Sequence, residues 1–178
     1  ALYPKNPFAH AMWGHWLGYQ RQPLDAVKER FRLALETNRE RAYVQRLRLS
    51  ALDWLGTREA VIETVKVVDE MRRAGEPLGQ DRRLDVARNV YARTAQYIEP
   101  QLLAVLTPAD HLATFRWLNE GRSLSNSPAE AYYLARLTEA TGDFRAAVDL
   151  YRPLLSLHTS FAEKIQAGFA RCEAELTK

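Results

Sequence analysis

One stretch near the carboxyl end, from Ser127 to Leu157, constrains the fold more than any other part of this sequence. It opens with Ser127 and Pro128, which are typical of a helix N-cap and of the first helical position. Gly142-Asp143 then interrupts the helical pattern, and Phe144 begins a second run with apolar residues at helical spacing. The stretch therefore predicts two helices joined by a tight turn. Because such a hairpin cannot bury its apolar stripe alone, we expect neighbouring helices to cover it.

Helical spacing of apolar residues extends along most of the chain. The sequence has no sustained alternation of apolar and polar residues, which is typical of strands. It also has no Asn-Gly or Asp-Gly dipeptide, which is typical of the turn in a β-hairpin. Asn6, Thr57 and Thr107 stand where N-caps are expected. Beside the hairpin, the expected helices are about 7–19, 23–36, 38–55, 58–75, 81–98, 100–106, 108–119 and 160–176. The sequence predicts an all-α fold of about nine to ten helices.

Particular residues of the hairpin at 127–157 match a known repeat pattern. Leu134-Ala135 occupies the place of a Leu-Gly/Ala pair, Gly142-Asp143-Phe144 the place of the turn and the aromatic after it, Ala147 the helix crossing and Tyr151 the second-helix aromatic. On these residues the hairpin resembles a tetratricopeptide repeat. The pattern departs from the family at Leu154, where a small residue is expected.

Two earlier segments carry a weaker form of the same pattern. Trp13-Gly14 resembles the Leu-Gly pair, Ala26 the crossing alanine and Ala34-Leu35 the terminal pair, with one residue more than usual between Ala26 and Ala34. In the second segment Gly56 fits the turn, whereas Val61 replaces the small crossing residue. The resemblance covers about half of the chain.

Membership of this family implies a right-handed superhelix, or solenoid, of antiparallel helix pairs. On that basis we expect residues 1–178 to form a single helical-repeat domain that is a fragment of a longer chain. The clearer repeats lie at about 7–36, 38–75 and 127–157, the middle at 80–121 is irregular, and the helix at 160–176 is a capping helix.

The resemblance also implies a binding groove, because the first helix of each family repeat lines a concave surface that holds peptides or another protein. Tyrosine and arginine are enriched among residues that dominate binding energy. The residues that the resemblance places on this groove are His15, Tyr19, Tyr43, Arg46, Ser50, Tyr132, Arg136 and Glu139, and Ala11 and Asp53 lie on the same expected face. The alternative interpretation is that they are ordinary half-exposed helix residues.

The predicted function is a non-catalytic scaffold module that binds a protein or peptide partner. An alternative is the sensor or docking region of a larger regulatory protein or enzyme. A third hypothesis, direct nucleic-acid binding, rests on basic residues at 30, 32, 39, 41, 46 and 48. Interleaved glutamates and a net charge of only +3 argue against nucleic acid and leave an acidic protein as an alternative partner.

No catalytic signature supports an enzyme, and no cofactor is implied. Two zinc-binding histidines on one helix usually stand four residues apart, whereas His10 and His15 stand five apart. Their side chains therefore diverge on a helix, and no metal is predicted. The single cysteine, Cys172, lies in a helical pattern and is interpreted as a buried structural thiol. Without a disulfide pair, an oxidising compartment is not implied.

The amino-terminal aromatics Phe8, Trp13 and Trp16 predict either a surface that a missing repeat would cover or a self-association contact. No apolar run reaches the ~20 residues that a membrane helix needs. With no signal peptide visible, a soluble and cytoplasmic protein is the favoured expectation.

Overall fold

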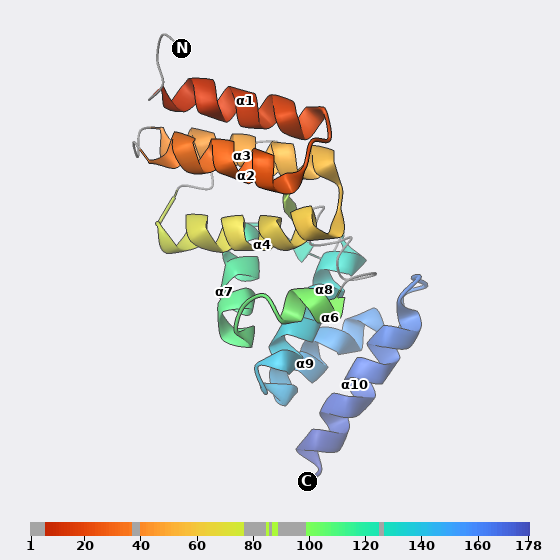
Figure 1. The fold of residues 1–178 in the computed structure, drawn as a ribbon. Helices are drawn as coiled ribbons and strands as arrows, with labels where there is room; N and C mark the ends of the chain where they lie inside the picture. The colour runs from red at the N-terminus through yellow and green to blue at the C-terminus, as the bar shows by residue number, and fades with distance from the viewer. Residues whose placement is uncertain (1–5, 37–39, 77–84, 86, 89–98, 125–126) are drawn as a thin grey trace. The chain divides into compact units, whose positions relative to one another are not determined.

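The computed structural model describes residues 6–36, 40–76, 85, 87–88, 99–124 and 127–178 (Figure 1). Across these residues there are nine α-helices, one 3-10 helix and no strand, which confirms the predicted all-α class. The helices are α1 (Pro7–Tyr19), α2 (Leu24–Leu35), α3 (Arg41–Leu55), α4 (Arg58–Arg73), α6 (Glu99–Leu103), α7 (Pro108–Leu118), α8 (Pro128–Ala140), α9 (Phe144–Tyr151), η2 (Arg152–Leu154) and α10 (Ala162–Leu176).

The helices group into two compact units, residues 1–90 and residues 91–178. The first contains α1 to α4, and the second contains α6 to α10. Most of the helix expected at 81–98 lies outside the described residues. The single repeat domain over 1–178 stays a prediction, and each unit is described below by itself.

Local sequence signals set most helix boundaries. Asn6, Thr57 and Thr107 each accept a backbone N–H in the first turn of α1, α4 and α7, as predicted for N-caps. Gly56 ends α3 in the left-handed region, at φ 62°, where a residue without Cβ is favoured. Ser127 is at the N-cap position of α8 and Pro128 is in the first turn, as expected, but the Ser127 side chain makes no capping hydrogen bond to α8.

The second helix of the carboxyl-terminal hairpin is shorter than the sequence pattern predicts. The apolar spacing favours a helix that continues to Leu157, but α9 ends at Tyr151 and the chain tightens into η2. Pro153 explains this difference, because a proline inside a helix lacks the N–H that the α-helical ladder requires. At the other end of α9, Asp143 accepts a hydrogen bond from the Ala146 N–H at 3.1 Å.

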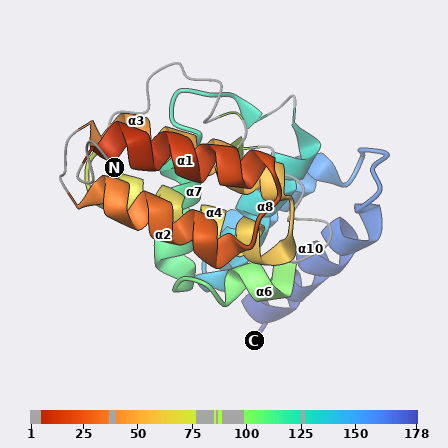
Figure 2. The same ribbon diagram turned by 45° about the horizontal axis from the view of Figure 1, so that its top comes forward.

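In the first unit, α1 lies beside α2 and α3 (Figure 2). The residues of α1 that are buried there have small side chains or none. A Cβ added to Gly14 would lie 2.8 Å from the Phe31 ring, and one added to Gly18 would lie 2.7 Å from the Ala51 carbonyl oxygen. We call the buried residues of α1 the small-residue seam: Pro7, Ala11, Gly14 and Gly18. Because this seam lacks bulk, the backbones of neighbouring helices approach α1 closely.

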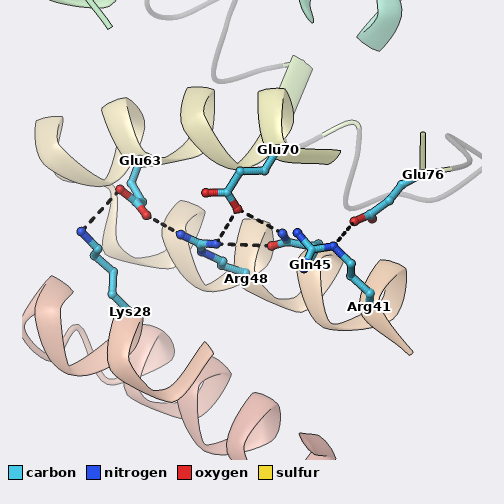
Figure 3. Close-up of polar contacts among 7 residues, drawn as sticks. All are labelled: Lys28, Arg41, Gln45, Arg48, Glu63, Glu70 and Glu76. Carbon is cyan, nitrogen blue, oxygen red and sulfur yellow. Dashed lines mark hydrogen bonds and ion pairs between the residues drawn. The ribbon is translucent and has the colours of Figure 1, made fainter. Parts of the chain in front are cut away.

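A chain of charged residues joins α2, α3 and α4 (Figure 3). The buried Arg48 of α3 donates to Glu63 and, at 3.1 Å, to Glu70, both on α4. Lys28 of α2 lies 3.6 Å from the other oxygen of Glu63. One buried guanidinium thus connects two carboxylates of α4, and Lys28 extends the network to a third helix.

In the second unit, buried aromatic rings join the helices. Tyr133 of α8 meets Phe115 of α7 edge to face, with ring centroids 5.5 Å apart. Tyr132 stacks on Phe161, just before α10, at 5.4 Å. A Cβ added to Gly168 of α10 would lie 2.6 Å from the Tyr151 hydroxyl, so α10 lies against α9 at a glycine.

Candidate functional site

Three side-chain pairs connect α1 and α3 across a shared face. The Phe8 and Tyr43 rings have centroids 6.1 Å apart, His15 Nε2 lies 3.2 Å from Ser50 Oγ, and the Tyr19 and Trp54 rings meet edge to face at 5.1 Å. We call these six residues the paired face. The members of every pair are separated by 35 residues, so α1 and α3 run in the same direction with a constant register.

The paired face combines exposed rings with one polar pair. Phe8, Tyr19 and Trp54 expose 43%, 55% and 47% of their surfaces, so three large rings of this face are open to solvent. His15 and Ser50 are half-buried between them. In this arrangement the aromatic rings can contact apolar groups of a ligand. The polar pair between the rings can bind a hydrogen-bonding group that lies between those apolar groups.

The structure brings together several residues that the sequence placed on a groove. His15 and Ser50 hydrogen-bond to one another, and Tyr19 and Tyr43 belong to the same face. Arg46 lies on α3 between Tyr43 and Ser50 and is half-buried. Arg46 also lies near Glu76, whose pKa is raised by burial, while Arg41 and Arg46 oppose that rise.

Phe8 and Trp54 belong to the paired face but were not among the predicted groove residues. The sequence pattern predicts Asp53 as the last residue of α3 on this face, whereas in the structure Tyr19 contacts Trp54. A signal for both residues exists in the sequence, because the 35-residue offset that relates His15 to Ser50 also relates Phe8 to Tyr43 and Tyr19 to Trp54.

The three groove residues predicted in the last hairpin belong to a buried cluster instead of an open face. Tyr132 is 2% exposed, and Glu139 is 9% exposed. The Glu139 carboxylate accepts the Tyr151 hydroxyl at 2.8 Å and Arg171 Nε at 2.8 Å, and Arg136 lies 3.3 Å away. These contacts join α8, α9 and α10, so their evident role in this unit is to hold the three helices together.

Several basic residues around α2 and α3 have carboxylate or aromatic partners. Arg32 pairs with Glu29 and Glu36, Arg41 with Glu76, and the Arg30 guanidinium lies 3.6 Å from the centre of the Trp13 ring. Near them is an open cavity of about 580 Å³. Its lining consists of Asp25, Lys28, Glu29, Arg32, Leu35, Glu36, Arg41, Arg48 and Glu70. Because basic and acidic residues balance there, the cavity has no charge preference for an anion.

Metal-ligand clusters and the single cysteine were the remaining chemical features to place among the described residues. Among them, no group of three or more histidine, cysteine, aspartate or glutamate side chains could hold a metal ion. Cys172 is buried, and burial, with help from Glu139, raises the pKa of its thiol from 9.0 to about 11. A thiol with so high a pKa is a poor nucleophile at neutral pH.

No helix within the described ranges combines the length and apolar character that crossing a membrane requires. In comparisons with family models, curated proteins and solved structures, nothing matched this chain, so the resemblance to tetratricopeptide repeats stays a prediction.

Proposed function

We propose that this protein is a non-catalytic interaction module that binds a protein or peptide segment along the paired face of α1 and α3. The carrying observation is the register of that face, in which exposed aromatic residues of two parallel helices contact one another at a constant offset of 35 residues. Exposed rings that are already held by a neighbouring helix lose little conformational freedom on binding.

The spacing of the pairs defines the kind of segment that fits. Phe8 and Tyr19 are separated by eleven residues, or about 16 Å along the α1 axis. An extended peptide covers that distance with about five residues. The preferred ligand would place apolar side chains against the two aromatic ends and a hydrogen-bonding group at His15 and Ser50.

The tetratricopeptide-like superhelix is part of this proposal. The parallel course of α1 and α3, with α2 packed against both, supports it, because in that family the first helices of successive repeats lie side by side at a period of about 34 residues. An interaction module is also favoured over nucleic-acid binding, since ion pairs with glutamates neutralise Arg32, Arg41 and Arg48.

A displayed library of random twelve-residue peptides, selected against the protein, tests the proposal. Peptides that are enriched should perturb the amide NMR signals of α1 and α3. Trp54→Ala and Tyr19→Ala should each weaken their binding about tenfold or more, which is the size expected for an aromatic hot spot.

Lys66→Ala is the matched control, because Lys66 is exposed on α4, a helix that contributes no residue to the paired face. Its affinity for the selected peptides should equal that of the unchanged protein. If the selected peptides bind Tyr19→Ala and Trp54→Ala with the same affinity as the unchanged protein, the binding site lies elsewhere.

A further inference from the structure

The open cavity that α2, α3 and α4 line is almost entirely charged, and we call it the charged cavity. Among its lining residues that the structure describes, only Leu35 is apolar, and the acidic and basic residues are equal in number. Its volume of about 580 Å³ is typical of small-molecule sites, but such sites are usually lined by hydrophobic side chains. The lining therefore favours a small ligand that is polar and that carries both signs of charge.

The charged cavity is separate from the paired face. At about 100° of rotation per residue, Arg41 and Arg48 are about 160–180° around α3 from Ser50. Ser50 faces α1, where it contacts His15, whereas both arginines line the cavity. A ligand in the charged cavity would thus lie on the opposite side of α3, and the inference does not rest on the proposed function.

Some charges of the lining are already used by neighbouring side chains. Arg32 pairs with Glu29 and Glu36, all on one side of the cavity. The buried Arg48 donates to Glu63 behind it. These pairs fix the wall of the cavity, so a ligand has to be held by groups with hydrogen-bonding capacity that the pairs leave unused.

Arg41 has such capacity. Its Nε donates to Oε1 of Glu76 at 3.0 Å, and Glu76 is buried, with 8% of its surface exposed. The terminal nitrogens of the Arg41 guanidinium make no hydrogen bond within the described part of the chain, and 32% of the side chain is exposed. A guanidinium that is anchored at Nε can offer these two nitrogens to a carboxylate as a bidentate fork.

Glu70 supplies a carboxylate oxygen near that fork. Its Oε2 accepts hydrogen bonds from Gln45 at 3.3 Å and from Arg48 at 3.1 Å, whereas Oε1 accepts none from the described residues. The Glu70 side chain is 47% exposed and lines the cavity. Gln45 follows Arg41 by about one helical turn, or roughly 6 Å along α3, so Glu70 lies about one turn from Arg41 (Figure 3).

We propose that the charged cavity binds a free α-amino acid as its zwitterion, with the carboxylate on the Arg41 fork and the ammonium on Oε1 of Glu70. In such a molecule the ammonium nitrogen and the carboxylate oxygens are about 3 Å apart, and a hydrogen bond of about 2.8 Å extends each end. The protein groups must then be roughly 6–8 Å apart, as one turn of α3 provides. A peptide has its free ends farther apart and cannot satisfy both groups.

The rest of the lining selects the side chain of the amino acid. On α2 the cavity presents both signs of charge, with Glu29, Lys28 and Arg32 among its lining residues. The amide of glutamine can donate to an acid and accept from a base. Leucine would displace water from these charges without replacing its hydrogen bonds. Glutamine should therefore bind about tenfold more tightly than leucine.

An NMR titration of the whole 178-residue protein with free L-glutamine, up to about 20 mM, tests the proposal. The dissociation constant should be roughly 1 mM, as expected for so small a ligand. The amide signals of Arg41, Gln45 and Glu70 should shift together. No shift at 20 mM, or shifts confined to the paired face, would overturn the proposal.

Analogues of glutamine test each half of the zwitterion. N-acetyl-L-glutamine lacks the ammonium and L-glutaminamide lacks the carboxylate, so each should bind about tenfold more weakly or worse. Equal binding by either analogue overturns the assignment of that half. A tripeptide with glutamine at its centre that binds more tightly than free glutamine would make the cavity a peptide site and also overturn the proposal.

Two conservative variants assign the protein groups. Arg41→Lys keeps the positive charge but loses the fork, and Glu70→Gln keeps an acceptor for Arg48 but loses the negative charge. Each should weaken glutamine binding about tenfold while circular dichroism stays unchanged. Glu59→Gln makes the same exchange at an exposed position of α4 outside the lining and should bind normally. Normal binding by Glu70→Gln would overturn the proposal.

A cross-test separates this site from the paired face. Tyr19→Ala should bind glutamine with the affinity of the unchanged protein, and Glu70→Gln should bind the selected peptides with unchanged affinity. Loss of glutamine binding in Tyr19→Ala would move the amino-acid site to the paired face and overturn the proposal.

Discussion

Tyr19 and Trp54 meet edge to face with ring centroids 5.1 Å apart, and the same 35-residue offset relates His15 to Ser50. This register makes α3 the structural counterpart of α1. It depends on close backbone packing, since Gly18 lies against Ala51 one residue before the end of α1. The register of the paired face therefore requires small side chains in the small-residue seam, where larger ones would not fit.

The first prediction concerns Gly18. Gly18→Ala should destabilise the protein by about 2 kcal/mol, because the new Cβ would meet the Ala51 backbone at 2.7–2.8 Å and this overpacking outweighs the ~1 kcal/mol gain in helix propensity. Gly14→Ala should cost less, since its nearest neighbour is the Phe31 ring, a side chain that can shift. Urea unfolding measures both. Greater stability of Gly18→Ala would contradict the close approach of α1 and α3.

Arg48 is the second test, because it is the buried cation of the network that joins α3 to α4. Arg48→Met should cost about 3 kcal/mol, since among the described residues the buried Glu63 would keep only Lys28, at 3.6 Å, as a cationic partner. Adding Glu63→Leu should recover much of that loss, because the unpaired charge is then removed. The measurement is the free energy of unfolding of both single variants and the double variant.

Arg152→Ala is the control for this network. Arg152 pairs with Asp149 on an exposed surface, where both side chains are more than half accessible. Its loss should change stability by no more than about 0.5 kcal/mol. A cost for Arg152→Ala equal to that of Arg48→Met would mean that burial does not set the strength of these pairs.

The third prediction separates packing from partner binding at Glu139. Glu139→Ala should destabilise the second unit by about 2–3 kcal/mol, because the Tyr151 hydroxyl and Arg171 lose their shared acceptor. Tyr151→Phe should cost about 1 kcal/mol, since the carboxylate keeps its arginines. A double-mutant cycle measures their coupling. Full additivity would show that the hydroxyl and the carboxylate do not interact.

The fourth prediction concerns the Cys172 thiol. Its pKa is raised from 9.0 to about 11 in the folded protein, so its contribution to stability is complete below pH 9 and is lost as the pH rises toward 11. At pH 8 a disulfide reagent such as Ellman's reagent should label the folded protein slowly and the urea-unfolded protein quickly. Rapid labelling under native conditions would contradict the buried position of this thiol.

A control variant separates the thiol from the rest of the pH dependence. Cys172→Ala removes the ionising group, so the fall in unfolding free energy between pH 9 and 11 should become smaller than in the unchanged protein. Its stability at pH 7 should also be lower, because truncation leaves space beside α10. An unchanged slope above pH 9 would assign the fall to other groups.

Helix positions were predictable from the sequence because the signals that set them are local. The Asn6, Thr57 and Thr107 caps act on N–H groups two or three residues away, and Gly56 ends α3 through its own backbone conformation. The early end of α9 has an equally local cause, because Pro153 converts the end of that helix into a 3-10 turn. Ser127 keeps the N-cap position of α8 without a capping hydrogen bond from its side chain.

The candidate site was predictable only in part. His15, Tyr19, Tyr43 and Ser50 lie on the shared face of α1 and α3, but Tyr132 and Glu139 are buried in the second unit. Position within a hairpin indicates which side of a helix faces its partner. It does not show that α10 covers Tyr132 and Glu139, because that contact involves residues about 30 positions away, such as Phe161 and Arg171.

By itself, the sequence determined that this protein is helical, where most helices begin and end, and that α1 has no charge. Only the tertiary structure decided which side of α1 is buried. Apolar periodicity cannot decide this for a helix that is apolar on all sides. Close approach to Phe31 and Ala51 selects the side with Gly14 and Gly18, and that choice leaves Met12 and Trp16 at the surface.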